Sequence, residues 1–361
     1  MQEKYYLRKW ELSLIVINLS VYRIFTGYAK IFSDVSGPSA PITALFSGVV
    51  AWLVIGGLLK LYEKNENKTL VKMATDCFGR AGGGAVFVIL ALYLLFSSSL
   101  TLRETGELIS AVSFPTAPVI FILLIVVLGA VVCCAQGFNA IANCHSVIIP
   151  ITLIVGGAVL IMGFSKGDIS YFTPYLGYGI ENTFIKGLSS LGLYSDLIIL
   201  FMLFPFTNGE GSYKRTVLLS VGTGVMINTL VILGFTMIAP YAVADTISHP
   251  YMQLVKLFSA GRFFQRIDGY FMYAIAGCGI LSLARNIFFI SYGAKEVFAL
   301  PKTRPFSYSL GLLVMFLSLL PKSRERANSI AQTSLWPFMG VVFLIALAVG
   351  IVYAFKRRKR L

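Results

Sequence analysis

Two charged residues stand inside stretches of the sequence that are otherwise apolar. Arg23 lies within Tyr-Arg-Ile-Phe-Thr-Gly at residues 22–27, and Asp196 lies within Gly-Leu-Tyr-Ser-Asp at residues 192–196. A charge at the depth of a bilayer costs on the order of several kcal/mol unless it faces a partner or a water-filled cavity. We therefore expect both segments to interrupt membrane helices and to line a path or site for a ligand.

Arg23 and the residues that follow it offer donors for an acidic ligand. An interrupted helix frees backbone groups, which are tolerated at membrane depth only where they line a cavity or meet a ligand. The freed N–H groups begin a half-helix that attracts a carboxylate, and Arg23 adds a planar fork of donors. Two alternatives stay open: Arg23 pairs with Asp196, or it extends along its apolar stem to the interface. Phe25, Thr26 and Gly27 belong to the same candidate site.

Asp196 falls near the middle of its apolar stretch, about eleven residues from the beginning of the stretch at 1.5 Å per residue. It is a candidate proton acceptor, cation ligand or counter-ion, and a constant salt bridge with Arg23 is the structural alternative. An isolated carboxylate in a membrane favours its neutral form, which a proton-coupled carrier exploits. Tyr194 and Ser195 precede it and join the candidate ligand site.

Other apolar stretches contribute small or hydroxyl-bearing residues near the predicted mid-depth. Tyr93, Ser97 and Gly277 are candidate ligand contacts on this ground. Small and hydroxyl residues also serve close helix packing, and that alternative applies to each of the three. Arg285 is predicted to lie near the inner end of its span, where it would act as an interfacial anchor.

The sequence offers no pattern typical of a metal site or a hydrolytic centre. Its five cysteines lack metal-binding spacing, and His145 and His249 are far apart. The glycines at residues 82–84 are not followed by the Lys-Ser or Lys-Thr of a phosphate-binding loop, so we predict a flexible turn there. We expect no metal, no cofactor and no enzymatic activity.

Composition places the chain in a membrane. Of its 361 residues, 57% are hydrophobic and 13% are charged, which is too apolar for a soluble globule. The net charge of +14 comes from Lys and Arg clustered between apolar runs, as membrane insertion requires, so nucleic-acid binding is not expected.

A bilayer core of about 30 Å requires about 20 apolar residues in each helix. That measure predicts ten transmembrane helices in a single domain covering residues 1–361. The interrupted helices are first and sixth, which predicts two five-helix repeats at residues 10–164 and 185–355, of the inverted kind that binds substrate near the midplane. The spans are predicted at residues 10–31, 41–61, 83–108, 118–135, 142–164, 185–206, 217–239, 263–294, 306–320 and 335–355.

The distribution of basic residues predicts that both termini are cytoplasmic. Most basic connections fall on the side of the N-terminus and of the basic tail at residues 356–361, whereas acidic residues that include Glu104 dilute the opposite side. Lys322, Arg324 and Arg326 break this pattern. Either they contact a partner or a headgroup, or the ninth helix is misplaced.

Two ordered sets of motifs resemble the spore germination permease family, the B-type integral membrane subunit of germinant receptors. The first set is Leu-Arg-Glu-Thr-Gly-Glu-Leu-Ile at 102–109, Phe-Pro-Thr-Ala-Pro at 114–118 and Gly-Phe-Asn-Ala-Ile-Ala at 137–142. The second is His-Pro at 249–250, Val-Lys at 255–256 and Phe-Gln-Arg-Ile-Asp at 264–268.

This resemblance implies an all-α, LeuT-like relative of the amino acid, polyamine and organocation transporters, with discontinuous helices 1 and 6. It implies a protein of the spore inner membrane or cell membrane that senses a small germinant, such as an amino acid. The implied partners are an A-type membrane subunit and a C-type lipoprotein. A proton- or cation-coupled amino acid transporter and a scaffold without a ligand are the alternatives.

Overall fold

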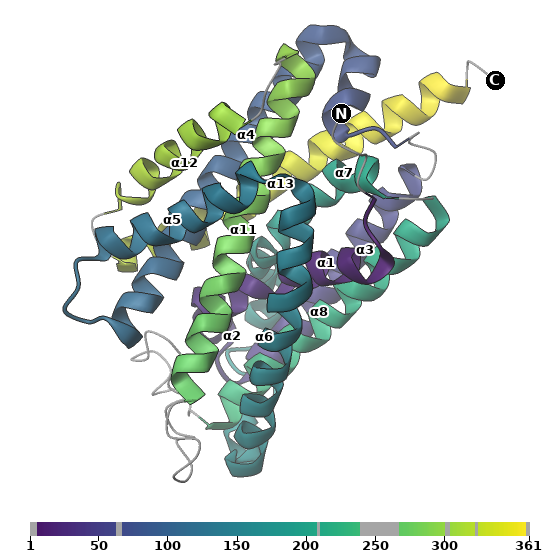
Figure 1. Ribbon diagram of the computed structural model, residues 1–361. Helices are drawn as coiled ribbons and strands as arrows, with labels where there is room; N and C mark the ends of the chain where they lie inside the picture. Colours follow the sequence, from purple (N-terminus) through teal and green to yellow (C-terminus); the bar gives the residue numbers. More distant parts are fainter. Residues whose placement is uncertain are drawn as a thin grey trace.

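The protein is a bundle of helices that run in many directions (Figure 1). The structure, a computed structural model, describes residues 6–62, 67–207, 210–238, 267–299, 304–321 and 324–358. Within these ranges all regular structure is helical, apart from one isolated bridge between Leu7 and Thr207. Most of the second motif set and residues 359–361 of the basic tail lie outside the described residues.

The labelled elements include ordinary α-helices and shorter π- and 3-10 segments, which carry the prefix η. In chain order they are α1 Lys9–Arg23, η1 Ile24–Tyr28, α2 Ala29–Ser36, η2 Gly37–Ser39, α3 Ala40–Leu61, α4 Leu70–Ser113, α5 Val119–Ala135, α6 Phe138–Lys166, η3 Ile169–Phe172, η4 Glu181–Ile185, η5 Lys186–Ile199, α7 Leu200–Leu203, η6 Phe204–Phe206, α8 Glu210–Ile238, α11 Ile267–Phe298, α12 Arg304–Ser318 and α13 Arg324–Arg358.

Seven helical stretches among the described residues are long and apolar enough to cross a bilayer. The apolar helix α5 has 17 residues, while α1 and α12 have 15 each. The predicted count of ten spans and the division into two repeats therefore remain predictions.

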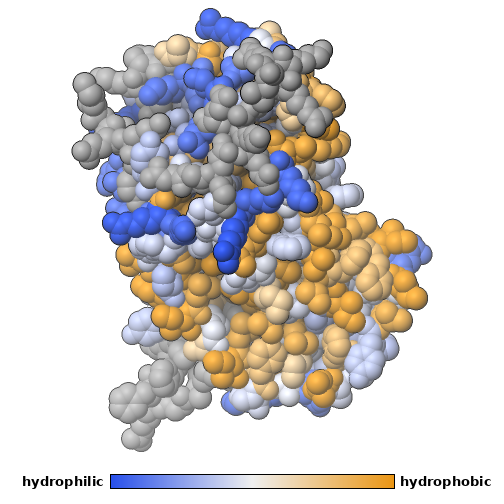
Figure 2. Space-filling view, turned by 90° about the vertical axis from the view of Figure 1, so that its right-hand side faces the viewer, coloured by the Kyte–Doolittle hydropathy of each residue, from blue (hydrophilic) through white to orange (hydrophobic). Residues whose placement is uncertain are grey.

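The outer surface of the bundle is apolar, as lipid requires. Large side chains such as Ile125, Ile154 and Leu312 expose 68 to 71% of their surface. Figure 2 shows hydrophobic side chains over most of one face, with hydrophilic ones gathered mainly toward one end. A soluble protein would not expose apolar patches of this size. The chain is an integral membrane protein.

The first predicted interruption coincides with a change of helix type. Helix α1 ends at Arg23, the π-helix η1 covers Ile24–Tyr28, and α2 continues from Ala29. A π-helix bonds residue i to i+5, so the backbone is widened there but still hydrogen-bonded.

The sixth predicted span contains a 3-10 helix of 14 residues, η5, which runs through residues 192–196. This length is unusual, since 3-10 runs longer than three or four residues are uncommon. Helix η5 is almost fully buried and packs against α1, α2, α3 and α13. It forms the centre of the bundle, and its side chains meet several neighbouring helices at once.

Two predicted turns have different outcomes. The prediction of a flexible turn at residues 82–84 is wrong, because α4 is helical there and departs from helical geometry at Gly79, where φ is +75°. The predicted turn between the fourth and fifth spans is present: α5 ends at Ala135, α6 begins at Phe138, and Gly137 has a φ of +97°. Both positive φ values favour glycine.

Helix α11 packs closely against α4, α5 and α6, and Gly279 permits part of that approach. A methyl group at Gly279 would lie 2.7 Å from Thr105 Oγ1 and 2.8 Å from the Tyr22 hydroxyl oxygen. The same hydroxyl oxygens of Tyr22 and Thr105 are hydrogen-bonded to each other. Close packing of this kind holds α1, α4 and α11 together around the centre of the bundle.

We expect Gly279→Ala to lower the thermal unfolding midpoint of the purified protein in detergent, because overpacking a filled site costs about 1–3 kcal/mol. Gly340→Ala in α13 is the matched control, since a methyl group there meets nothing within 4 Å. Alanine also favours a helix over glycine. A midpoint for Gly279→Ala equal to or above that of the control would contradict the close approach of α11.

Candidate functional site

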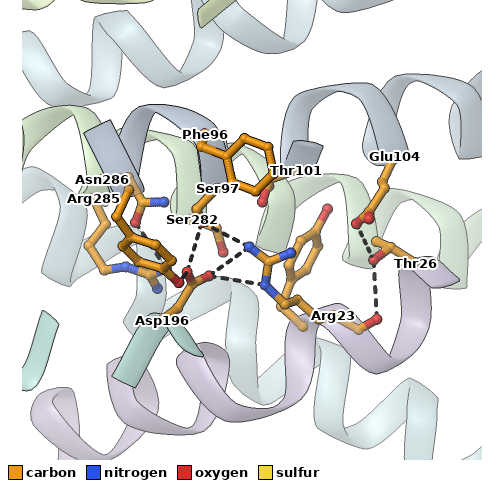
Figure 3. Close-up of polar contacts among 12 residues, drawn as sticks. Arg23, Thr26, Phe96, Ser97, Thr101, Glu104, Asp196, Ser282, Arg285 and Asn286 are labelled. Atoms are coloured by element: carbon orange, nitrogen blue, oxygen red, sulfur yellow. Dashed lines mark hydrogen bonds and ion pairs between the residues drawn. The ribbon is translucent and has the colours of Figure 1, made fainter. Parts of the chain in front are cut away.

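Arg23 and Asp196, which lie 173 residues apart in the sequence, form an ion pair in the centre of the bundle (Figure 3). Arg23 Nε and Nη2 each lie 3.3 Å from Asp196 Oδ2. The two side chains expose only 1% and 5% of their surfaces. Arg23 is the last residue of α1 and Asp196 belongs to η5, so the pair joins the two segments that the sequence singles out.

Helix α4 supplies hydrogen bonds to the other carboxylate oxygen. Tyr93 OH and Ser97 Oγ donate to Asp196 Oδ1 over 2.8 and 2.7 Å. The two donors are four residues apart and therefore share one face of α4. Ser97 Oγ also accepts a hydrogen bond from Arg23 Nη2 over 2.8 Å. We call Arg23, Tyr93, Ser97 and Asp196 the Asp196 cluster.

The Asp196 cluster satisfies the carboxylate without any ligand. Removing a carboxylate and a guanidinium from water is costly, and their attraction offsets that cost only when hydrogen bonds occupy the remaining lone pairs. Here both oxygens of Asp196 have donors, from α1 on one side and α4 on the other. The arrangement therefore ties α1, α4 and η5 to one another.

Thr26 extends the polar centre toward a second carboxylate. Its hydroxyl donates to Glu104 Oε2 over 2.7 Å and lies 3.2 Å from the carbonyl oxygen of Arg23. Glu104, which the charge pattern predicts on the outer side of the membrane, has a buried side chain with 6% exposure, and its side of the membrane stays a prediction. The side chain is buried because α4 carries it along the face that packs on η1.

Tyr194 and Ser195 lie beside Asp196 in η5 but make different contacts. The Tyr194 hydroxyl accepts a hydrogen bond from Asn228 Nδ2 of α8 over 3.3 Å. Ser195 Oγ is buried and has no hydrogen-bond partner among the described residues.

The remaining predicted site residues lie around this centre. Phe25 of η1 packs edge-on against Phe271 of α11, with ring centroids 5.7 Å apart. Gly27 belongs to η1. Gly277 faces α6, where a methyl group would lie 3.0 Å from Ile148 Cγ2. Gly277 thus lies at a helix contact, whereas Arg23, Thr26, Tyr93, Ser97 and Asp196 come together directly.

Arg285 is a central residue that the sequence analysis misplaced. The prediction of an interfacial anchor is wrong, since Arg285 exposes 1% of its surface. It lies beside Asp196, on the opposite side from Arg23, and experiences attraction from Asp196 and repulsion from Arg23 (Figure 3). Its Nη2 donates to Asn286 Oδ1 over 3.4 Å. A signal was present in the sequence, because apolar residues flank Arg285 on both sides.

A second buried polar group joins α1, α6 and α11. Asn18 Nδ2 lies 3.2 Å from both His145 Nε2 and Ser282 Oγ, and His145 Nδ1 lies 2.8 Å from the Ile141 carbonyl oxygen. A proton on Nδ1 would bond to that carbonyl and leave Nε2 to accept from Asn18. Spacing in the sequence does not reveal a partner for His145, because residues from three separate helices assemble this group.

A pocket with about 440 Å³ of empty volume lies beside η1, the π-helix that follows Arg23. We call it the Tyr28 pocket, and it is lined by Tyr28 of η1, Ile31, Asp34 and Val35 of α2, Ser189 of η5, and Gln332 and Thr333 of α13. Tyr28 is buried, and a methyl group at Gly192 would lie 3.0 Å from its hydroxyl oxygen. The absence of a side chain at Gly192 thus allows Tyr28 to lie close against η5.

A second, apolar pocket with about 540 Å³ of empty volume lies between α1, α6, α8 and α11, with Phe25, Tyr22 and Cys278 among its lining residues. Within the described ranges, no three His, Cys, Asp or Glu residues are grouped closely enough to hold a metal ion.

The fold is that of membrane transporters. The crystal structure of MhsT in complex with L-phenylalanine superposes with a TM-score of 0.64 at 11% identity, covering 98% of this chain and 96% of that one. A manganese transporter of Eremococcus coleocola superposes with a TM-score of 0.68, also at 11% identity, over 96% of this chain and 78% of that one. A helical membrane bundle of the LeuT-like class is therefore the class that the fold defines.

The chain belongs to the spore germination permease family, because a family model described as "Spore germination protein" matches residues 6–327. Spore germination protein B2 of Bacillus subtilis is 25% identical over 240 residues, which covers 65% of this chain and 64% of that protein. Spore germination protein YndE of the same organism is 23% identical over 89% of each chain. Spore germination protein XB of Bacillus anthracis is 25% identical over 88% of this chain and 86% of its own.

The Asp196 cluster generates a prediction about stability. Asp196→Asn removes the charge that Arg23 faces, so we expect it to lower the free energy of unfolding by roughly 3–5 kcal/mol, the range for breaking a buried ion pair. Arg23→Gln should have a similar effect. The double variant should lose less than the sum of both, because neither charge then stays buried alone. Thermal or denaturant unfolding in detergent measures all three.

Ser309→Ala is the control variant, since its hydroxyl on the exposed surface of α12 contacts only the Pro305 carbonyl oxygen, 3.4 Å away. Strictly additive losses in the Arg23 and Asp196 variants would contradict direct coupling of the two charges.

Proposed function

We propose that this chain is the germinant-sensing membrane subunit of a spore germination receptor. It binds a small molecule, with an amino acid as the favoured class, at the midplane around Arg23 and Asp196. The observation that carries the proposal is the Asp196 cluster itself: a buried charged centre at the junction of η1 and η5, in a chain of the spore germination family. The relatives are named as spore germination proteins, and the MhsT structure contains L-phenylalanine.

Ten transmembrane helices in two inverted repeats, at residues 10–164 and 185–355, form the scaffold in this proposal. Both termini, including the basic tail at 356–361, face the cytoplasm, and the membrane is the spore inner membrane or the cell membrane. The similarity in fold to the two transporters and the clustering of basic residues support these assignments.

The ligand reaches the centre through the Tyr28 pocket in this proposal. The pocket lies between α2, η5 and α13, and Tyr28 forms its floor in the same π-helix that follows Arg23. Polar lining residues such as Asp34, Gln332 and Thr333 suit a hydrophilic solute. Tyr28 then separates this pocket from Arg23 and moves aside to admit the ligand. The bound molecule is surrounded by the Asp196 cluster and by Phe25, Thr26, Gly27, Tyr194, Ser195 and Gly277.

Sensing requires that the ligand favour one arrangement of the helices over another, since a ligand shifts an equilibrium only by its differential affinity for the two states. Helices α1, α4 and η5 are the elements that the Asp196 cluster joins. A ligand that changes this cluster changes their relative positions. An A-type membrane subunit and a C-type lipoprotein would respond to that change.

We expect at least one small solute to raise the thermal unfolding midpoint of the purified protein, because ligand binding stabilises the state it binds by about 2.7 kcal/mol at a hundredfold excess over Kd. The panel is the twenty L-amino acids together with uncharged sugars and nucleosides. Asp196→Asn should reduce the shift, and Ser309→Ala should leave it unchanged. A response that is flat for every compound would contradict the sensing proposal and favour a scaffold.

A proton- or cation-coupled amino acid transporter is the second candidate. The observation that favours it is the fold, which the chain shares with transporters over nearly its whole length. Because a sensor and a carrier use the same pocket, only flux separates them. We expect proteoliposomes containing the isolated chain to bind radiolabelled amino acid without accumulating it. Uptake that an imposed proton gradient drives, and that Asp196→Asn abolishes, would instead support the transporter.

A further inference from the structure

Arg285 is a buried guanidinium whose donors are mostly unused. It lies in the middle of α11, it exposes 1% of its surface, and its one recorded hydrogen bond is the 3.4 Å contact from Nη2 to Asn286 Oδ1. Nε and Nη1 have no partner among the described residues, and neither does Asn286 Nδ2. A guanidinium carries five N–H donors and no acceptor, so burial in this state leaves a substantial desolvation cost uncompensated.

Asp196 does not supply the missing partner. Its Oδ1 accepts from Tyr93 and Ser97, and its Oδ2 lies against Arg23. Arg285 approaches the same carboxylate from the other side, so two cations share one negative charge (Figure 3). Glu104 does not correct the imbalance near Arg285, because it lies beyond Arg23 at the opposite end of the group and accepts from Thr26.

The unpaired polar atoms around this centre are predominantly donors. Arg23 Nη1, Arg285 Nε and Nη1 and Asn286 Nδ2 are pure donors without a partner among the described residues. The buried hydroxyls of Thr101 and Ser195 also lack a partner among the described residues, and a hydroxyl can donate or accept. Asn228 Oδ1 is the only pure acceptor in that same group. The partner that these atoms lack is therefore an acceptor with negative charge.

We propose that Arg285, with Asn286, binds the carboxylate of the ligand, on the side of Asp196 away from Arg23. The inference rests on the proposed sensing function and specifies its ligand class: a small carboxylic acid. The fork of Arg285 matches the two oxygens of a carboxylate, and charge-assisted bonds of this kind are stronger than neutral ones. Recognition depends on the acid group, since the oxygens of Asp196 already have donors and offer little to a ligand ammonium.

The test compares acids with their uncharged amides on the purified wild-type protein. The probes are L-alanine, L-leucine and L-phenylalanine, the C-terminal amide of each, and chloride at constant ionic strength. We expect at least one acid to bind, and its amide to bind about 10- to 100-fold more weakly, as the loss of a hydrogen-bonded charge implies. Thermal shift and isothermal calorimetry give the affinities. This arm requires no variant and so does not depend on the folding of one.

Arg285→Gln should remove the difference between acid and amide, and Arg285→Lys should keep part of it because the charge remains. Ser309→Ala should retain the full difference. If Arg285 serves only as a second counter-ion of Asp196, Arg285→Gln will lower the thermal unfolding midpoint but leave the ratio of acid to amide affinity unchanged. That result would overturn the inference.

The remaining outcomes separate this inference from the sensing function. Equal affinity for acids and amides overturns the carboxylate site and leaves the sensing proposal intact. Binding of an uncharged sugar or nucleoside, with no binding of any acid, has the same consequence. Chloride could raise the thermal unfolding midpoint as much as the acids do, and Arg285→Gln could remove that rise. This result would assign the site to an inorganic anion and would also overturn the inference. If no compound of either panel binds, both proposals fail.

Discussion

One buried carboxylate holds the centre of this protein together. Asp196 accepts hydrogen bonds from α1 and α4 while it belongs to η5, so three elements depend on the position of a single side chain. In a membrane the helices gain little from hydrophobic association, because the surrounding lipid is as apolar as their own side chains. Specific polar contacts and close packing therefore decide which helices touch. A displacement of any of the three elements leaves a charge or a hydroxyl unpaired, which favours discrete arrangements over gradual drift.

The two elements that carry the charges differ from ordinary α-helices, and this affects what they can do. The π-helix η1 follows Arg23 directly, and the 3-10 helix η5 carries Asp196. Both types have poorer hydrogen-bond geometry than the α-helix and often mark functional positions. A 3-10 helix rises about 2.0 Å per residue instead of 1.5 Å, so conversion to an α-helix would shorten η5 and shift its side chains. The centre thus combines strong side-chain contacts with a backbone that departs from α-helical geometry in both elements that carry or adjoin the charges.

The sequence predicts the main pair well and its surroundings poorly. Arg23 and Asp196 stand out because each interrupts an apolar stretch, and the periodicity of α4 places Tyr93 and Ser97 on one face. Periodicity and span length give depth in the membrane, but they do not tell which helices become neighbours. The contact between Glu104 of α4 and Thr26 of η1 was therefore not predicted. The group of Asn18, His145 and Ser282 was missed for the same reason, since it is assembled from three helices.

The error at Arg285 has a simpler origin. Within the span predicted at residues 263–294, Arg285 lies nine residues before the end. Depth along a helix does not tell whether a side chain faces the bundle or the membrane interface, and α11 directs Arg285 into the bundle. The turns were predicted with mixed success. The chain folds back between α5 and α6, where Gly137 has a positive φ, but in α4 the residue with positive φ is Gly79 and not the glycine run after it.

The position of Arg285 changes how the centre should be understood. On the Arg23 side both oxygens of Asp196 have donors and Nη1 of Arg23 lacks a partner within the described structure, whereas on the Arg285 side Nε and Nη1 of Arg285 and Nδ2 of Asn286 all lack one. A ligand that displaced Arg23 would have to break a satisfied ion pair, which is costly. A ligand that supplied an acceptor to Arg285 would instead give its buried donors the partner that they lack. Asp196 lies between the two arginines, so such a ligand would also change the electrostatic attraction between Asp196 and Arg23, which holds α1 against η5. Binding at α11 would then alter contacts at the other side of the bundle.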